Sequence, residues 1–390
     1  MVTVRRSVAL LGATGSVGTQ TLDVLRCEPD RFDLVSVAGS RRLRELAAVV
    51  REFRVARVGI AREQDRAAMR EMVGPAVEIL VGPEGLAALA ASADIVVNAV
   101  VGFAGLPVTM AALASGRRLA LANKESLIAA APLVESVRAT PGAEILPIDS
   151  EHCAIYQCLA GSADGPGRPD VRRLILTASG GPFRGWTREQ LARASTADAL
   201  HHPTWSMGAK ITIDSSTLMN KGLEVLEASA LFGVAADRVT VVVHPQSIVH
   251  SMVEYVDGAV IAQLSRPDMR LPIAYCLGMP DRLDHAWGQL DFTSAFALTF
   301  EPPDVEAFAA LPLAYEAARL GGAAPAWLSA ANEVAVAACL EGRVAWRDIV
   351  PIVSAVMDSY EPGPLSSIEE LYAHDARARE LARSLVEVVA

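Results

Sequence analysis

Two carboxylates stand two residues apart where an apolar segment ends. Residues 143–148 are mostly apolar and are predicted to form a strand, and Asp149, Ser150 and Glu151 follow it directly. Because side chains alternate along an extended segment, we expect the carboxylates of Asp149 and Glu151 to point the same way. Neighbouring carboxylates repel each other unless a proton or a cation lies between them, and hard oxygen donors suit magnesium or manganese best. The pair is a candidate metal site, and a solvated turn is the alternative interpretation of an isolated Asp-x-Glu.

A helix predicted farther along the chain carries three more polar side chains on one face. Residues 214–217 are all of types that cap helices, and we expect the helix that they open to cover about 218–232. Asn220, Lys221 and Glu224 are spaced three and four residues apart, so they share a face of that helix. Beside a helix N-terminus such a set could serve a phosphate and a metal together. The alternative is an exposed Lys–Glu pair without a ligand.

A glycine-rich turn near the N-terminus follows another predicted strand. Residues 7–11 are apolar, and after them come Gly12-Ala13-Thr14-Gly15-Ser16-Val17-Gly18 and a helical pattern through Leu25. Glycines at a strand-to-helix turn let the backbone approach a pyrophosphate, and the helix N-terminus directs N–H groups at it. We interpret the segment as a dinucleotide-binding turn, although its spacing differs from the commoner Gly-x-Gly-x-x-Gly.

Strand-like and helical segments alternate over the N-terminal part of the chain. After the first strand, the predicted strands cover residues 32–38, 55–60, 77–81, 94–100, 118–122 and 143–148. Such alternation predicts a parallel sheet with helices on both faces, that is, a Rossmann-like, doubly wound α/β domain. We expect this domain to span residues 1–148 and to bind the dinucleotide.

The end of the second strand indicates which dinucleotide binds. Gly39, Ser40, Arg41 and Arg42 follow this strand, and none of them is an acid that could bind a ribose 2′-hydroxyl. Two arginines suit a 2′-phosphate, so NADP(H) is favoured over NAD(H). The alternative is two solvated arginines at the start of a helix.

Two other polar segments follow apolar strands. Residues 98–102 and the sequence Asn123-Lys124-Glu125 should lie at the carboxyl edge of the sheet, where ligands bind in such folds. Polar residues in these places can equally be helix caps. Lys124 is the residue that we favour for chemistry.

The middle of the chain is predicted to be α+β. Strands are expected at 171–177, 239–243, 247–256 and 259–264, and the last two are joined by Asp257-Gly258, a hairpin signal. Residues 185 to about 210 show little periodicity and contain His201, His202, Trp205 and Met207. A long irregular stretch of this composition is typical of an active-site lid, and a packed surface loop is the alternative.

The C-terminal part is predicted to be a helical bundle. Helical patterns lie at about 304–320, 325–341, 345–358 and 366–388. We therefore expect a dinucleotide-binding domain over 1–148, a catalytic domain over 149–285 with a lid at about 180–209, a linker over 286–303 and a helical domain over 304–390.

Composition narrows the class of protein. The chain has 390 residues, 52% of them hydrophobic and 21% charged, which indicates a folded globular protein. Its net charge of −10 disfavours nucleic acid and anionic lipid as partners. The uncharged stretch 95–116 is interrupted by Asn98, Gly102, Gly105 and Pro107, so we predict no membrane span. Five cysteines without a Cys-x-x-Cys pair indicate reduced thiols and a cytoplasmic protein.

With these residues in view, the chain resembles the 1-deoxy-D-xylulose 5-phosphate reductoisomerase family over nearly its whole length. The resemblance rests on the glycine turn at 12–18 and on the sequences Ala122-Asn123-Lys124-Glu125-Ser126, Pro147-Ile148-Asp149-Ser150-Glu151-His152, Thr177-Ala178-Ser179-Gly180-Gly181-Pro182-Phe183-Arg184, His202-Pro203, Trp205-Ser206-Met207-Gly208, Met219-Asn220-Lys221-Gly222-Leu223-Glu224 and His244-Pro245-Gln246-Ser247-Ile248-Val249-His250. Two departures are Ser40-Arg41-Arg42, where the family usually has Lys or Arg and then Asn, and Thr204, where Asn is common.

The resemblance implies roles for named residues. One divalent cation, magnesium or manganese with cobalt as a further option, is bound by Asp149, Glu151 and Glu224. The substrate phosphate is bound by Ser179, Ser215, Asn220 and Lys221. Lys124, Ser150, Glu151 and His202 surround the reacting carbons, and Trp205 and Met207 cover the ligand. The cofactor contacts Thr14, Gly15, Ser16, Val17, Gly39, Asn123, Glu125 and Gly208, with Ser40 and Arg41 near the 2′-phosphate.

The resemblance also implies a reaction and an assembly. The ketose phosphate rearranges to a branched aldehyde phosphate, and NADPH then reduces the aldehyde to 2-C-methyl-D-erythritol 4-phosphate in non-mevalonate isoprenoid biosynthesis. Catalysis would rest on Lys124, Asp149, Glu151 and Glu224, and the protein would be a homodimer.

Two other functions fit the sequence less well. A semialdehyde dehydrogenase needs a nucleophilic cysteine beside a base, but Cys153 and His152 are adjacent and would point apart along a strand. An NADPH-sensing regulator would have no use for the complete acidic set.

Overall fold

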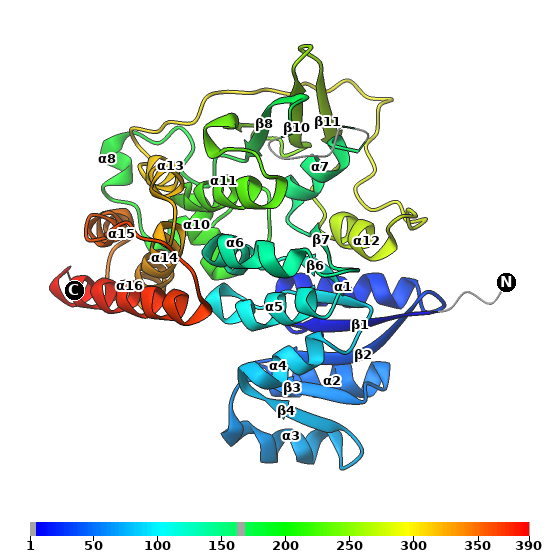
Figure 1. Cartoon of the computed structure of the whole chain (residues 1–390). Coiled ribbons are helices and arrows are strands. Elements are labelled where there is room, and N and C mark those ends of the chain that lie inside the picture. Colours follow the sequence, from blue (N-terminus) through cyan, green and yellow to red (C-terminus); the bar gives the residue numbers. More distant parts are fainter. Residues whose placement is uncertain (1–4, 161, 163–167, 390) are drawn as a thin grey trace. The chain divides into compact units, whose positions relative to one another are not determined.

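The computed structural model describes residues 5–160, 162 and 168–389, and these divide into two compact units (Figure 1). Unit 1 comprises Met1–Ser126, Val134–Cys153 and Asp268–Trp287. Unit 2 comprises Leu127–Leu133, Ala154–Pro267 and Gly288–Ala390.

Unit 1 contains a seven-stranded sheet in the order β4-β3-β2-β1-β5-β6-β7, and every strand in it pairs in parallel. The strands are β1 (Arg6–Leu11), β2 (Phe32–Gly39), β3 (Arg57–Ile60), β4 (Glu78–Val81), β5 (Ile95–Asn98), β6 (Arg118–Leu121) and β7 (Glu144–Pro147). The central strand β1 is inaccessible to solvent from Val8 to Leu11, as expected for a parallel sheet with both faces covered. The order reverses between β1 and β5, and the carboxyl ends of these two strands form the switch point where such folds bind ligands.

The helices of this part alternate with the strands as predicted. They are α1 (Ser16–Cys27), α2 (Leu43–Phe53), α3 (Arg66–Val73), α4 (Gly82–Ala90), α5 (Leu106–Ala114), α6 (Lys124–Arg138), α7 (Ser150–Cys158) and α12 (Arg270–Gly278), with 3-10 turns at Glu63–Asp65 and Gly102–Gly105. The segment after α12 is bound to the sheet, because Arg6 and Arg118 both donate to the carbonyl oxygen of Met279, at 3.0 and 2.6 Å. The predicted Rossmann-like, doubly wound fold is confirmed.

Unit 2 contains a mixed sheet in the order β11-β10-β8-β9. Its strands are β8 (Val171–Ala178), β9 (Val239–Val243), β10 (Val249–Tyr255) and β11 (Val260–Leu264). Strand β8 pairs with β9 in parallel and with β10 antiparallel, and β10 pairs antiparallel with β11. The Asp257-Gly258 hairpin is confirmed: Gly258 has φ 89°, and its N–H donates to the Tyr255 carbonyl oxygen.

The other regular elements of unit 2 are helices, including those of the predicted C-terminal bundle (orange to red in Figure 1). They are α8 (Arg188–Leu191), α9 (Thr196–Ala199), α10 (Ala209–Ser216), α11 (Met219–Phe232), α13 (Ala310–Leu320), α14 (Ala324–Leu340), α15 (Ile349–Met357) and α16 (Ile368–Val389), with 3-10 turns at Ala236–Arg238 and η4 (Trp346–Asp348). Within residues 5–160, 162 and 168–389, no helix combines the length and apolar character that crossing a bilayer requires.

Three local predictions were wrong. Residues 214–217 do not open the helix that carries Glu224: residues 214–216 form the last turn of α10, and α11 begins at Met219. The acidic pair does not lie on an extended segment, because β7 ends at Pro147 and α7 begins at Ser150. The stretch from 185 to about 210 is not wholly irregular, since it contains α8, α9 and the start of α10.

Candidate functional site

The turn between β1 and α1 can be formed only by glycine at two positions. Gly12 has φ 96°, and a Cβ atom there would lie 2.3 Å from the Ala99 carbonyl oxygen. A Cβ atom at Gly18 would lie 2.2 Å from the Gly12 carbonyl oxygen. Helix α1 therefore starts directly against the switch point between β1 and β5, which is where the predicted turn needs it.

The N-terminus of α1 is open to an anion. Its N-cap residue Gly15 supplies no side-chain cap, and its first turn has no acidic residue. Gly15 and Ser16 are exposed, while Thr14 and Val17 are half-buried. Uncapped N–H groups and the positive end of the helix dipole favour a pyrophosphate at this position.

The end of β2 meets this turn. Arg42 donates from Nη1 to the carbonyl oxygen of Thr14 at 3.0 Å, and a Cβ atom at Gly39 would lie 3.5 Å from the Thr14 hydroxyl. Ser40 and Arg41 are exposed beside it. Cationic side chains thus lie next to the glycine turn, as a 2′-phosphate requires.

The side chain of Asn123 is used by the fold. Its Oδ1 accepts from the Ser126 N–H at 3.0 Å, which caps α6, and its Nδ2 donates to the carbonyl oxygens of Val100 and Gly102 at 2.6 and 2.8 Å. The side chain of Asn123 therefore acts as a helix cap, which was the alternative interpretation. A contact between Asn123 and the cofactor would have to be made by its backbone. Glu125, the predicted cofactor residue two positions after Asn123, is buried.

Lys124 and Asp149 form a buried ion pair within unit 1. Lys124 Nζ lies 2.6 Å from Asp149 Oδ2, and their side chains are only 6% and 11% exposed. The His152 ring lies 3.1 Å from the other carboxylate oxygen of Asp149. Burial alone would raise the pKa of Asp149, but the Lys124 ammonium and the His152 ring hold this pKa well below its usual value. Asp149 is therefore a carboxylate at neutral pH.

Glu151 lies in the first turn of α7. Its Oε2 accepts from the Ser150 hydroxyl at 2.6 Å, and its N–H donates to Asp149 Oδ1 at 3.3 Å. The backbone carbonyl of Asp149 accepts the first intrahelical bond, from Cys153, so Asp149 is the N-cap of this helix. The sequence signal for this arrangement was the N-cap preference of Asp, not strand alternation.

Within unit 2, α11 presents its first turn without a cap. The residue before it, Leu218, has φ 59° and supplies no side-chain hydrogen bond, and the first turn has no acidic residue. Lys221 donates to Glu224 and to the carbonyl oxygen of Thr177, and Asn220 donates to Glu224 Oε1 at 2.5 Å. Lys221 and Glu224 are 3% and 1% exposed, so the alternative of an exposed pair is wrong.

Two serines approach this helix start from other elements. A Cβ atom at Gly181, which has φ 67°, would lie 2.7 Å from the Ser215 carbonyl oxygen, so the turn after Ser179 packs directly on the end of α10. The N–H of Gly181 donates to Ser179 Oγ at 3.2 Å. The structure therefore brings Ser179 and Ser215 together, although 36 residues separate them in the numbering.

His202 is oriented by its backbone neighbours. Its Nδ1 accepts the N–H groups of Thr204 and Trp205 at 3.1 and 2.9 Å, so in the neutral ring the proton lies on Nε2. Nε2 then donates to Ser179 Oγ at 3.0 Å. The histidine of the predicted lid thus contacts one of the predicted phosphate residues.

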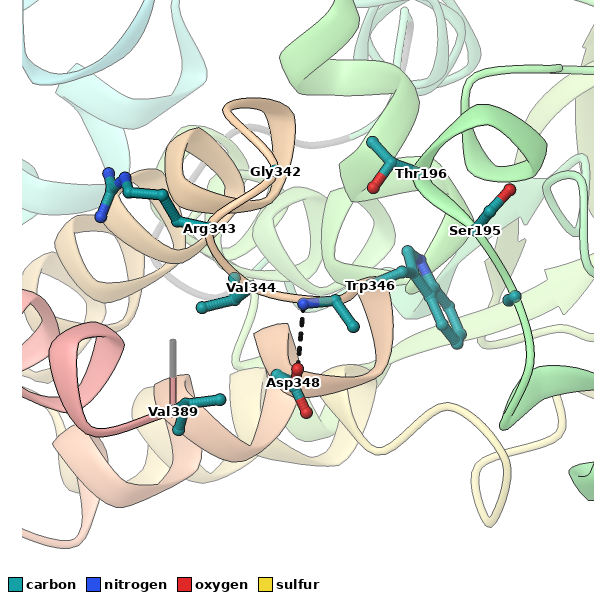
Figure 2. A pocket seen from close by; sticks show the side chains of 10 residues that line it. Ser195, Thr196, Gly342, Arg343, Val344, Trp346, Asp348 and Val389 are labelled. Atoms are coloured by element: carbon teal, nitrogen blue, oxygen red, sulfur yellow. Dashed lines mark hydrogen bonds between the residues drawn. The ribbon is translucent and has the colours of Figure 1, made fainter.

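Other lid residues are less constrained. The Trp205 ring lies 6.1 Å from the His250 ring, Met207 is half-buried, and Gly208 is the exposed N-cap of α10. None of the described contacts joins Gly208 to another predicted cofactor residue. A cavity of about 470 Å³ in unit 2 is lined by Thr196, Trp346, Asp348 and their neighbours, none of which is a predicted site residue (Figure 2).

Local patterns did not indicate several buried polar residues. Asp214 is 1% exposed and lies next to Ser215, where it accepts from Lys210 and from Asn332 of α14. Glu227 is fully buried one turn after Glu224 in α11. The only sequence signal for Glu227 is its spacing of three residues from Glu224, and nothing in the sequence connects Asn332 to α10.

The fold and these residues define a class of protein. The chain has a doubly wound sheet with a glycine turn at its switch point and arginines after the neighbouring strand β2. An α+β unit with carboxylates and anion-binding groups follows. This combination is typical of an NADP-dependent oxidoreductase. Models of three domain families match the chain. They are "1-deoxy-D-xylulose 5-phosphate reductoisomerase" over residues 8–131, "1-deoxy-D-xylulose 5-phosphate reductoisomerase C-terminal domain" over 145–232 and "DXP reductoisomerase C-terminal domain" over 264–381.

Full-length relatives give the same family. The 1-deoxy-D-xylulose 5-phosphate reductoisomerase of Chlorobaculum tepidum is 49% identical over 384 residues, covering 98% of this chain and 100% of that one. The enzyme of that name from Geobacter sp. (strain M21) is 47% identical over 386 residues, covering 98% and 99%. The chain belongs to the 1-deoxy-D-xylulose 5-phosphate reductoisomerase family.

Solved structures of the family are similar throughout. The 1-deoxy-D-xylulose 5-phosphate reductoisomerase of Zymomonas mobilis in complex with NADPH has a TM-score of 0.90 and 42% identity, covering 98% of this chain and 100% of that one. A DOX-P reductoisomerase in complex with NADPH, fosmidomycin and magnesium has a TM-score of 0.93 and 41% identity, covering 98% of each chain.

Proposed function

We propose that this chain catalyses the NADPH-dependent conversion of 1-deoxy-D-xylulose 5-phosphate to 2-C-methyl-D-erythritol 4-phosphate, with a divalent cation, in non-mevalonate isoprenoid biosynthesis. The observation that carries the proposal is similarity along the whole chain, from the glycine turn to the helical bundle, to enzymes of that name at 47–49% identity. Relatives that bind NADPH and magnesium share its fold at TM-scores of 0.90 and above.

The substrate phosphate is assigned to the open end of α11. Ser179 and Ser215 lie at two backbone segments in contact, and Asn220 and Lys221 occupy the first turn of an uncapped helix. Hydroxyl and amide donors, an ammonium and a helix dipole together provide the environment that an anion needs. His202, which donates to Ser179, belongs to the same set.

The cation is assigned to Asp149, Glu151 and Glu224. Each offers a carboxylate oxygen, and an all-carboxylate set suits magnesium or manganese better than a thiolate-binding metal. The Lys124 ammonium holds the pKa of Asp149 below its usual value, so this acid is present as a carboxylate ligand at neutral pH. The Lys221 ammonium is in ion-pair contact with Glu224. A divalent cation in this set supplies electrostatic stabilisation to negative charge that develops on substrate oxygens.

The protein side chains have further roles in the reaction. Lys124 places a second positive charge near the substrate oxygens, and Ser150 orients Glu151 through a hydrogen bond. Trp205 and Met207 of the lid, over about 180–209, would exclude water when the phosphate is bound, since binding energy remote from the reacting carbons can drive such closure. NADPH is assigned to Thr14, Gly15, Ser16, Val17, Gly39, Ser40, Arg41, Asn123, Glu125 and Gly208.

A semialdehyde dehydrogenase is disfavoured by the position of the cysteine. Cys153 is 2% exposed within α7, where a substrate carbonyl cannot reach it. An NADPH sensor is disfavoured because Asp149 and Glu224 are buried charges that a protein without the cation has no reason to retain.

We further propose that the enzyme is a cytoplasmic homodimer, with cofactor, catalytic and helical domains divided as in the family (1–148, 149–285 and 304–390). Strand β11 is an edge strand, and it exposes Val260 and Ile261 at 50% and 48%, with Val256 at 54% in the adjoining turn. Such an edge needs a cover, and a second copy of the sheet supplies one. All five cysteines are free thiols, which fits a reducing compartment.

The reaction is tested by NADPH oxidation with 1-deoxy-D-xylulose 5-phosphate, followed at 340 nm. We expect turnover with added manganese or magnesium, loss of turnover with a chelator, and recovery when excess manganese is restored. Turnover that survives complete chelation would contradict the cation assignment, and no consumption of NADPH with any divalent ion would contradict the function.

A further inference from the structure

Ser215 lies between two buried residues that are both bound to the C-terminal helices. Asp214 is 1% exposed, accepts from Asn332 Nδ2 of α14 at 2.8 Å, and pairs with Lys210 at 2.7 Å. Ser216 is also 1% exposed, and its hydroxyl accepts from the indole N–H of Trp346 at 2.7 Å. The last turn of α10 is therefore fixed from both sides of Ser215.

Trp346 also contacts the other half of the phosphate site. Its ring lies 4.6 Å from the Phe183 ring in an edge-to-face arrangement. Phe183 is fully buried and lies four residues after Ser179, in the loop that follows β8. One side chain of the C-terminal region thus joins the Ser179 turn to the helix that carries Ser215.

The other surroundings of Trp346 make its hydrogen bond to Ser216 important for the orientation of the ring. The loop that carries this residue borders the cavity of about 470 Å³, together with Thr196 and Val389 (Figure 2). A ring that borders a cavity is less restrained by packing than one enclosed on all sides, so the bond to Ser216 has a larger share in orienting it.

The amide of Asn332 is buried, and its burial costs stability. It is fully buried, and among the described residues its Oδ1 has no hydrogen-bond donor. An apolar side chain of similar size would avoid burying that oxygen, but it would also remove a donor from the buried Asp214 carboxylate. The Nδ2 bond to Asp214 fixes the residue next to Ser215.

We infer that Trp346, supported by Asn332, is a positioning residue for phosphate binding: it fixes Ser215 relative to Ser179 and so sets the affinity for the sugar phosphate. The inference rests on the proposed function, which assigns Ser179 and Ser215 to the substrate phosphate. A displacement of a few tenths of an ångström between the two hydroxyls lengthens their hydrogen bonds to a bound phosphate and weakens them.

The test compares two substitutions of the same kind. Trp346→Phe keeps an aromatic ring against Phe183 but removes the donor to Ser216. Trp327→Phe is the matched control, because Trp327 of α14 is equally buried and its indole donates at 3.0 Å to His374 of α16, away from α10. Both variants lose one indole hydrogen bond, which is buried for Trp346 and part-buried for Trp327, so both should lose some thermal stability.

We expect Trp346→Phe to raise the KM for 1-deoxy-D-xylulose 5-phosphate roughly three- to tenfold, the range of one lost hydrogen bond, with kcat and the Kd for NADPH unchanged. Trp327→Phe should leave all three constants unchanged. In a Ser215→Ala background the effect of Trp346→Phe on KM should disappear, because the residue acts through Ser215. Ser216→Ala removes the acceptor of the same hydrogen bond and should raise KM in the same way. This variant replaces Trp346→Phe in the test if Trp346→Phe does not fold.

An unchanged KM in Trp346→Phe, an equal rise in Trp327→Phe, or full additivity with Ser215→Ala would each overturn the inference. The KM of Ser215→Ala distinguishes a failure of this inference from a failure of the proposed function on which it rests. A wild-type KM in Ser215→Ala removes the phosphate assignment itself, whereas a raised KM there with a normal Trp346→Phe overturns only the role of Trp346.

Discussion

Substitution of Lys221 tests how charge is balanced between Lys221 and Glu224 at the start of α11. The two side chains are 4% and 1% exposed and in ion-pair contact, and Lys221 also donates to the carbonyl oxygen at Thr177. Lys221→Met keeps most of the apolar stem but removes the ammonium, which leaves the Glu224 carboxylate buried with less compensation. Breaking such a pair from one side costs about 3–5 kcal/mol. At about 2 °C per kcal/mol for a chain of this size, the Tm without metal should fall by roughly 6–10 °C.

The matched control removes both charges. In Lys221→Met/Glu224→Leu no carboxylate is left buried, so most of the lost stability should return, as replacement of buried pairs by apolar residues is often neutral. Thermal unfolding followed by circular dichroism measures both variants, with and without manganese. Manganese should raise the Tm of Lys221→Met, where Glu224 remains, and should raise that of the double variant much less. A single variant within 2 °C of wild type, or a double variant as unstable as the single one, would refute this account of the pair.

Three further predictions concern the site and the assembly. Glu224→Gln should lower metal-dependent turnover by orders of magnitude while NADPH still binds, as measured by steady-state kinetics and cofactor fluorescence, and a near-normal rate would contradict its role as a ligand. His202→Ala should raise the KM for the sugar phosphate more than the Kd for NADPH, because its Nε2 donates to Ser179, and an unchanged KM would remove it from the site. Ile261→Lys, on the exposed edge strand β11, should convert a dimer to monomers in light scattering, and a dimer that persists would place the interface elsewhere.

The parallel sheet was predictable because its signals are local. Each strand of unit 1 is a short apolar run, and β1 is solvent-inaccessible from Val8 to Leu11, so burial follows from composition alone. The glycine turn was predictable for the same reason, since Gly12 and Gly18 have no room for a Cβ atom. Predicted strand ends differ from those observed by one or two residues at most positions, because pairing and not composition decides where a strand stops.

The start of α11 was not predictable from residue types. Asp, Ser and Thr favour N-caps, but their side chains can also bond back to carbonyls in the last turn of a helix. Ser216 donates to the Ile213 carbonyl oxygen at 2.6 Å and Thr217 to that of Asp214 at 3.1 Å, so these residues end α10. Leu218 then adopts a left-handed conformation, with φ 59°, which its type does not indicate. The helix start was therefore placed a residue or more too early, although the shared face of Asn220, Lys221 and Glu224 was unaffected.

Burial is the property that decides what the site residues can do, and spacing along a helix does not reveal it. The i,i+3 pattern of Lys221 and Glu224 is the same on a solvated helix, where such a pair contributes a few tenths of a kcal/mol. In this chain α11 packs on β8 and β9 on one side and on α13 on another, so the pair is nearly inaccessible to water. Away from water the dielectric constant is low, so each charge of the pair interacts more strongly with its neighbours. If one neighbour is removed, the charge that remains is costly to bury. At the uncapped start of α11, a buried carboxylate beside a buried ammonium is costly for the stability of the fold. The binding of an anion and a cation there gives the chain a reason to retain both charges.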